Sequence, residues 1–288
     1  MPPDLTGILN VNKPKGWTSH DVVAKVRRLA GQKRVGHAGT LDPMAEGVLP
    51  VLLGRATRLA DFIQAGRKVY AAVIMLGVAT ETDDAEGAVL STSDVPPLSP
   101  ESLLEALASF EGEILQAPPR YSALKVDGRR AYAVARAGGA VTLAPRRVTI
   151  YRVSLLGCTA DRLAIEVECS KGTYIRALAR DIAVRLGTVG HLAELRRTRV
   201  GHLTFETAQT MENLAQNGIA NYLEQASCVI PEAPAVSANE HEAAKLRNGQ
   251  PIVANGLQAD AVWVYDPVGL LLCLASADGA QLRPRLML

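Results

Sequence analysis

The sequence predicts an α+β fold followed by a smaller β-rich module. Apolar runs of strand length occur at residues 7–11, 48–53 and 69–76. A helical period is clearest at residues 175–186. After about residue 231 the pattern changes to one short helix and a few short strands. The expected strands outnumber the helices but are interspersed with them, which is typical of the α+β class.

The first part of the chain is expected to contain a strand, a helix and a shaped loop. The strand at 7–11 ends in the turn-forming sequence NKPKG. Thr18 and Ser19 can cap a helix at 20–29, which carries three valines on one face. The three glycines and one proline of residues 34–47 predict a loop with a specific backbone shape.

The next elements are a short helix at 57–63, the strand at 69–76 and a helix at 101–110. The acidic stretch at 80–84 has the composition of a solvated hairpin turn. The sequence ETDDAEG around it lacks the ligand pattern of a calcium loop, so we do not predict a calcium site.

Residues 116–143 are irregular and basic, and strands are expected at 147–156 and 163–168. The helix at 175–186 follows, and Gly187 ends it. Its apolar face consists of Ile175, Leu178, Ala179, Ile182, Ala183 and Leu186.

The change of pattern near residue 232 predicts a domain boundary. We expect a larger domain at 1–232 and a small module at 233–288. The elements expected in the small module are a helix at 240–247 and strands near 261–265, 270–274 and 282–286.

The composition, with 288 residues of which 48% are hydrophobic and 21% charged, is that of a globular protein with a sizeable core. No apolar run is long enough to cross a bilayer and the N-terminus has no signal-peptide pattern, so a cytoplasmic protein without membrane contact is expected. The cysteines are scattered, without histidines at zinc-motif spacing. We therefore expect reduced thiols and no metal site, at Cys158, Cys169, Cys228 and Cys273.

The net charge of +2 conceals strong segregation. Residues 1–70 carry 11 basic and 5 acidic side chains, whereas residues 71–119 carry no basic and 9 acidic side chains. Residues 120–199 carry 16 basic and 6 acidic side chains, and residues 200–288 carry 4 basic and 9 acidic side chains. Two basic blocks that fold together would form a face for a polyanion such as RNA. A basic surface that is merely solvated explains the charge alone equally well.

Asp42 is the acid of greatest interest, because it lies in the glycine-containing loop. The chain has neither a G-x-G-x-x-G fingerprint nor a P-loop, so the glycines do not predict a nucleotide-cofactor site. Asp42 before Pro43 could cap a helix. Alternatively, it could be a nucleophile near the cations of Lys33 and Arg34. The nearby His37 could simply bond to backbone.

Five motifs occur in the order and spacing of a known family. The segment GHAGTLDPMAEGVLPVLLGRATRL resembles the catalytic segment of the TruB family of tRNA pseudouridine synthases. The other matching segments are NKPKGWTSHDVV, VYAAVIMLG, PPRYSALKVDGRRAYAVAR and CSKGTYIRALARDI, the last followed by HLAELRRTRVG. The resemblance covers roughly residues 7–205. It implies a mostly antiparallel central sheet with flanking helices and an RNA-gripping insertion at about 116–143. The small module loosely resembles an RNA-binding PUA-like domain.

The resemblance implies catalytic roles for three residues. Asp42 matches the catalytic carboxylate, and Arg176 matches the arginine that pairs with it through a planar fork capable of two parallel hydrogen bonds. Tyr70 matches the aromatic residue that stacks on the target base. Taken alone, Tyr70 could be a strand residue and Arg176 a surface arginine. Three further matches line the nucleotide pocket or fill the space of extruded bases: His37, Tyr174 and Leu195.

The basic insertion is interpreted as an RNA clamp, since cations with tyrosines between them suit a phosphate track with stacking contacts. Its candidate RNA-binding residues are Arg120, Lys125, Arg129 and Arg130. A folded hairpin whose tyrosines pack on the core is the alternative.

The function implied by the resemblance is isomerisation of the uridine at position 55, in the T-arm of transfer RNA, with the base flipped into the pocket. No cofactor, metal or protein partner is expected, and the chain is expected to be a monomer. The alternatives are a non-catalytic RNA-binding or RNA-folding module, a guide-RNA-dependent pseudouridine synthase, and a synthase for ribosomal RNA.

Overall fold

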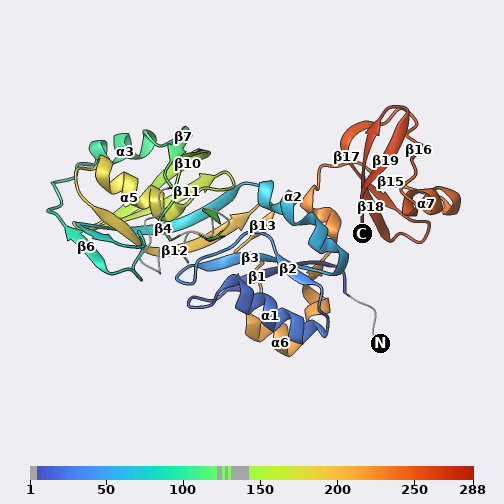
Figure 1. Cartoon of the computed structure of the whole chain (residues 1–288), viewed down its shortest axis with the longest axis horizontal. Helices are drawn as coiled ribbons and strands as arrows, with labels where there is room; N and C mark the ends of the chain where they lie inside the picture. The colour runs from blue at the N-terminus through green and yellow to red at the C-terminus, as the bar shows by residue number, and fades with distance from the viewer. Residues whose placement is uncertain (1–4, 122–124, 127–128, 131–142) are drawn as a thin grey trace.

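The computed structural model describes residues 5–121, 125–126, 129–130 and 143–288. It confirms the predicted α+β class, with a large, mostly antiparallel sheet, a few helices packed against it and a smaller β module (Figure 1). None of the helices in these residues combines the length and the apolar character needed to cross a membrane.

The strands of the large sheet are β1 (Gly7–Lys13), β2 (Val35–His37), β3 (Glu46–Leu53), β4 (Lys68–Leu76), β7 (Gly112–Gln116), β10 (Arg146–Cys158), β11 (Arg162–Cys169), β12 (Gly190–Val200), β13 (Leu203–Thr204) and β14 (Leu223–Glu224). Their order is β14-β1-β3-β12-β4-β11-β10-β7, with β2 paired to β3 and β13 to β12. Only β3 and β12 are parallel among these pairs.

Helices cover the two halves of this sheet separately (Figure 1). The helices of the large domain are α1 (Ser19–Ala30), α2 (Ala60–Ala65), α3 (Pro100–Ala108), α5 (Ile175–Arg185) and α6 (Met211–Asn217), with 3-10 turns η1 (Gly54–Leu59), η2 (Ile219–Tyr222) and η3 (Ala226–Val229). Apolar residues of α3 and α5 pack on β4 and β10 to β12. Those of α1 and α6 pack on β1 to β3. The predicted cap of α1 is confirmed, because Thr18 accepts a hydrogen bond from the Asp21 amide.

The central strand β12 has no counterpart among the strands predicted from the sequence. Its segment mixes apolar residues with four charged ones, and charged residues indicate a surface. In the structure β12 lies between β3 and β4, and its Arg197 is only 1% exposed. Arg197 is therefore a buried cation, and its structural role follows from the groups that accept its hydrogen bonds.

Two small hairpins leave the large sheet. One joins β5 (Val78–Thr80) to β6 (Val89–Thr92), around the acidic turn. The other joins β8 (Lys125–Val126) to β9 (Arg129–Arg130) within the basic insertion. The rest of that predicted insertion, residues 122–124, 127–128 and 131–142, lies outside the described residues.

The C-terminal module contains β15 (Ala235–Ser237), α7 (Glu240–Arg247), β16 (Ile252–Val253), β17 (Gln258–Tyr265), β18 (Leu271–Asp278) and β19 (Gln281–Met287). Its sheet has the order β15-β17-β18-β19-β16. Trp263 is buried in a cluster shared with β3 and η1, and its indole Nε1 donates to the Ile230 carbonyl at 3.0 Å. The module is thus packed on the large domain by apolar contacts.

Candidate active site

One cavity of about 870 Å³ opens beside the loop between β2 and β3. All six residues predicted for catalysis or nucleotide binding line it: His37, Asp42, Tyr70, Tyr174, Arg176 and Leu195. Its volume lies within the roughly 300–1,000 Å³ that is usual for small-ligand sites. The fold therefore brings these distant sequence positions around a single space.

The loop that carries Asp42 is held by side chains from the start of the chain. Ser19, at the beginning of α1, accepts from the Leu41 amide at 2.9 Å and donates to its carbonyl at 3.2 Å. Lys13 is fully buried, and its Nζ donates to the carbonyl of Pro43 at 3.4 Å. A turn and then β3 follow Asp42, so the interpretation of Asp42 as a helix cap is wrong.

Arg197, which is distant in the sequence, binds the same loop from β12. Its Nε donates to the Val48 carbonyl at 2.7 Å, and its Nη2 donates to the Gly39 carbonyl at 3.0 Å. Where β3 and β12 meet, Gly47 has a φ of +103°, and a Cβ there would collide with the carbonyl oxygen of Arg197. The loop shape therefore depends on the close approach of these two strands.

Arg176 lies in the first turn of α5, with its guanidinium almost entirely buried. A cation is unfavourable at a helix N-terminus, so its position is explained by its partners and not by the helix. Its Nε lies 2.9 Å from Oδ2 of Asp42. Among the described residues no acceptor meets this Nε–H at a hydrogen-bonding angle. The contact is therefore an ion pair, and the expected pair of parallel hydrogen bonds to Asp42 is not present.

The two ends of the guanidinium bind other segments instead. Nη1 donates to the Thr82 carbonyl at 3.0 Å, and Nη2 donates to the Tyr121 carbonyl at 3.0 Å. Tyr121 also lines the cavity. Arg176 thus connects the Asp42 loop, the acidic turn and the first residues of the basic insertion.

The prediction of a solvated turn at 80–84 is wrong for Asp84. Its side chain is 7% exposed and lies 3.4 Å from Nη1 of Arg176. The turn is anchored to β12 by the Leu192 amide, which donates to the Asp83 carbonyl at 3.0 Å. Sequence reasoning missed Asp84, because acidic turn residues are usually exposed.

Exposure separates the two carboxylates that share Arg176. The side chain of Asp42 is 35% exposed, compared with 7% for Asp84. Both line the cavity, but only the Asp42 carboxylate presents a large surface to a molecule bound there. Asp84 is suited to holding Arg176, and Asp42 to contacting a substrate.

Tyr70 lies on β4, directly opposite Arg197 of β12 in the strand register. It is 8% exposed, and burial raises the pKa of its phenol. The phenol therefore stays protonated at neutral pH. Its ring offers the cavity an uncharged aromatic surface.

His37, Tyr174 and Leu195 complete the predicted set. Burial lowers the pKa of His37, whose ring makes an edge contact with His20 at a centroid distance of 5.5 Å. The backbone of Tyr174 is held by Gln116, whose Oε1 accepts from the Tyr174 amide at 2.8 Å. Leu195 is a buried residue of β12. His37 lies on β2, Leu195 lies on β12, and Tyr174 is the N-cap residue of α5.

Lys68 is a cavity residue that sequence reasoning missed. It begins β4, is 6% exposed, and its Nζ donates to the Gly66 carbonyl at 2.6 Å. Burial lowers its pKa to about 8. Its position before an apolar strand gave no signal of burial, because lysine commonly flanks strands at the surface.

The candidate RNA-binding residues flank a residue of the cavity wall in the sequence. Arg120 is exposed and precedes Tyr121 in the cavity wall. Lys125 pairs with Arg130 in the register of the β8–β9 hairpin, which also includes Arg129. The basic insertion therefore starts at the cavity.

Two family models match consecutive parts of the chain. Residues 27–175 match the N-terminal domain of the TruB family pseudouridylate synthases. Residues 176–231 match the C-terminal domain described for tRNA pseudouridylate synthase B. Together these matches include the cavity residues from His37 to Leu195.

Curated relatives match almost the full length. The protein named tRNA pseudouridine synthase B from Arthrobacter sp. (strain FB24) is 43% identical, over 98% of this chain and 96% of its own. The protein of the same name from Rhodococcus jostii (strain RHA1) is 45% identical, over 96% and 91%.

Solved structures share the fold. A chain in a structure of an H/ACA RNP bound to a substrate RNA containing 2'-deoxyuridine has a TM-score of 0.73 at 24% identity, covering 98% of this chain and 84% of that one. A chain in a Cbf5-Nop10-Gar1 complex has a TM-score of 0.72 at 26% identity, with the same coverage.

Proposed function

The chain belongs to the TruB family of pseudouridine synthases, and from this premise we propose that Asp42 is the carboxylate that drives its reaction. The enzyme is an isomerase that converts uridine to pseudouridine in tRNA.

The reaction makes limited demands on the protein. The bond between ribose C1′ and uracil N1 breaks, a bond between C1′ and C5 forms, C5 loses a proton and N1 gains one. No electrons are transferred to or from the substrate. A carboxylate can attack C1′, attack the ring or remove a ribose proton, and each route needs it beside the glycosidic bond.

The carboxylate of Asp42 is exposed to the cavity, whereas its partner Arg176 is buried. The Arg176 Nε lies 2.9 Å from Asp42 Oδ2 and leaves 35% of the Asp42 side chain exposed. An ion pair on one side orients the carboxylate, while the open side can reach the substrate. Asp84, at 7% exposure, keeps the guanidinium in place.

The cavity suits a base that has left its stack. Tyr70 supplies an aromatic surface beside Asp42, and extruded bases are commonly held by stacking on such rings. We assign His37 to the space vacated by the flipped base, and Tyr174 and Leu195 to the walls of the nucleotide pocket.

We assign residues 1–232 to the catalytic domain and 233–288 to a PUA-like RNA-binding module. Arg120 and the β8–β9 hairpin would grip the T-arm, since the insertion starts at the cavity wall. The enzyme would act as a monomer without a guide RNA. The tRNA-named relatives are 43–45% identical, whereas the two ribonucleoprotein chains are 24–26% identical, which favours direct action on tRNA.

The test is to map pseudouridine in tRNA transcripts and in an isolated T-arm stem-loop after incubation with the purified full chain alone. We expect modification of the uridine at position 55 in both RNAs. Pseudouridine elsewhere in the tRNA would contradict the T-arm assignment. Reaction of the full-length tRNA only would show that recognition extends beyond the T-arm, and a requirement for added RNA would contradict guide-free action.

A further inference from the structure

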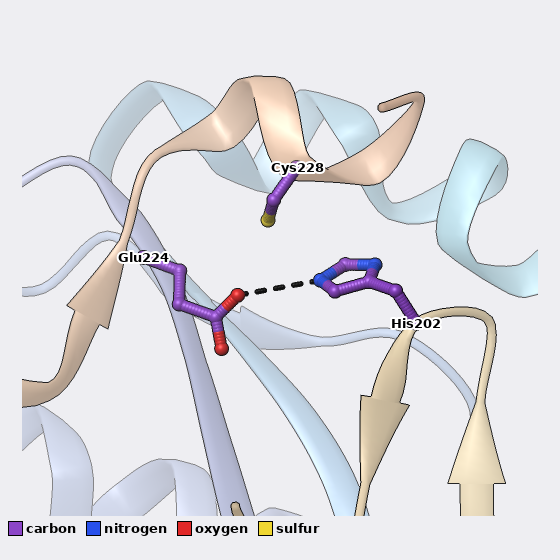
Figure 2. Close-up of side chains that lie close together, drawn as sticks. All are labelled: His202, Glu224 and Cys228. Carbon is purple, nitrogen blue, oxygen red and sulfur yellow. Dashed lines mark hydrogen bonds and ion pairs between the residues drawn. The ribbon is translucent and has the colours of Figure 1, made fainter. Parts of the chain in front are cut away.

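Outside the active site, the described residues contain one group of three side chains with metal-binding atoms, His202, Glu224 and Cys228. These ligand atoms all lie within 4.8 Å of one another. Figure 2 shows the imidazole, the carboxylate and the thiol directed toward a common space. They come from the turn between β12 and β13, from the end of β14 and from η3.

We propose that His202, Glu224 and Cys228 bind a zinc ion, with the fourth tetrahedral position open to water. Zinc accepts nitrogen, oxygen and thiolate ligands, whereas Mg²⁺ and Ca²⁺ prefer oxygen alone. The Nε2 of His202 lies 3.3 Å from Oε2 of Glu224. Two ligand atoms at 2.0–2.1 Å from a tetrahedral ion would lie about 3.4 Å apart. These two atoms thus already have the required separation.

The backbone around the three residues is held by contacts that do not involve the ion. Glu224 pairs with Ile8 of β1 in the large sheet. The amide of Gly201, next to His202, donates to the Arg67 carbonyl at 2.9 Å. Binding therefore requires adjustment of side chains but no rearrangement of strands. The side chains of His202 and Glu224 are 33% and 38% exposed, which gives an ion access from solvent.

The location gives the ion a structural role. None of the three residues lines the catalytic cavity. Ile230, two residues after Cys228, accepts the indole hydrogen bond from Trp263 of the C-terminal module. Zinc would therefore tie the large sheet to the segment that leads into this module.

This group could not be recognised from the sequence, because His202 is far from the other two residues and does not form a zinc-motif spacing with them. The competing explanation is a cluster that is satisfied by its own hydrogen bonds. Burial, and then Glu224, raise the pKa of Cys228 to about 12, so without metal the thiol is protonated. Zinc binding would displace this proton.

The experiment uses the full chain after treatment with a chelator. Zinc titration with a competing indicator dye gives the stoichiometry and affinity, and Co²⁺ substitution reports thiolate ligation through its charge-transfer absorption. We expect a single equivalent of zinc and a thiolate–cobalt band. Cys228→Ser and His202→Asn should each weaken binding by more than the roughly 10–100-fold typical of losing an outer-shell partner. Cys158→Ser, at an exposed cysteine away from the site, is the matched control.

Thermal unfolding keeps the test decisive if Cys228→Ser folds poorly. Zinc should raise the Tm of the wild type and of Cys158→Ser, because it binds the folded state. Glu224→Gln, which retains the size of the side chain, should melt like the metal-free wild type and show no rise with zinc. Absence of the cobalt band in the wild type, unchanged zinc affinity in Cys228→Ser, or a wild-type rise in Glu224→Gln would overturn the proposal. These readouts are independent of pseudouridine formation.

Discussion

The Oδ2 atom of Asp84 lies 3.4 Å from Nη1 of Arg176, while Nε of the same guanidinium lies 2.9 Å from Asp42. One buried cation is therefore shared by two carboxylates of unequal exposure. A single buried pair is sensitive to the loss of one partner, because the remaining charge is left uncompensated. Here Asp84 restricts the position of Arg176, and Arg176 in turn restricts the position of Asp42.

Asp84→Asn should lower turnover by about 10- to 100-fold, since small displacements of a reacting group have effects of this size. RNA affinity should change little, because the Asp84 side chain is only 7% exposed. Single-turnover pseudouridine formation and filter binding provide the two measurements. Asp83→Asn is the control, as Asp83 pairs with Arg180 instead. Equal losses in both variants would mean that the turn as a whole matters and not its contact with Arg176.

Asp42→Asn should abolish isomerisation and leave RNA affinity within a few-fold. The substitution preserves size and polarity but removes the negative charge needed for attack or proton removal. Glu46→Gln, which removes a nearby carboxylate paired with Arg196, is the control and should remain active. Turnover above about 1% of wild type, with reversion by deamidation excluded, would show that Asp42 is not essential.

Arg176→Lys should reduce turnover by roughly ten-fold or more with little change in RNA binding. Lysine keeps the charge, but its single nitrogen cannot reach Asp42 and the carbonyls of Thr82 and Tyr121 together. Arg180→Lys, one turn further along α5, serves as the comparison. A parallel loss of turnover and affinity would instead place Arg176 on an RNA phosphate.

Lys68 should make stability depend on pH in the alkaline range. Burial lowers its pKa from 10.5 to about 8, so between these values the unfolded chain binds the proton that the folded chain has lost. The free energy of unfolding of wild type minus that of Lys68→Met should therefore rise from pH 8 to 10.5, by on the order of 1–3 kcal/mol. Urea denaturation at several pH values measures this difference, and Lys33→Met, at an exposed lysine, is the control. If the difference in unfolding free energy stays constant or falls over this pH range, the pKa of Lys68 is not lowered by burial.

Replacing Arg129 and Arg130 by alanine should weaken RNA binding and reduce the slope of log affinity against log salt by about one to two units. The single-turnover rate at saturating enzyme should stay near wild type, because the proposed clamp performs no chemistry. The double lysine variant keeps both charges and should retain the salt slope. Normal affinity with a rate that saturating enzyme cannot restore would mean that the hairpin shapes the active site.

Sequence patterns predicted the α+β class, because its apolar strands and the amphipathic helix α5 have unambiguous periods. The resemblance also selected six residues that the fold gathers around one cavity. Their proposed roles remain predictions, which the substitutions above test.

The buried polar residues could not be predicted in the same way. Lys13, Asp84 and Arg197 are charged, so sequence reasoning places them at the surface. Asp84 and Arg197 have partners distant in sequence, such as the loop carbonyls that accept from Arg197, and Lys13 is buried with contacts to both nearby and distant carbonyls. The local sequence pattern does not indicate such contacts. The strand β12 was not predicted for the same reason, because its charged residues interrupt the apolar pattern. The grouping of His202 with Glu224 and Cys228 likewise depends on tertiary structure alone.

The contact between Arg197 and the Asp42 loop also determines when the proposed catalytic centre can form during protein synthesis. Gly39 and Val48 are 158 and 149 residues from Arg197 along the chain. At about 5–20 residues per second, a ribosome needs roughly 8–30 s to add the intervening segment. During that interval the loop lacks the guanidinium that binds its carbonyls. The nascent N-terminal strands therefore lack the contacts that complete the Asp42 loop, which form only after β12 has paired with β3.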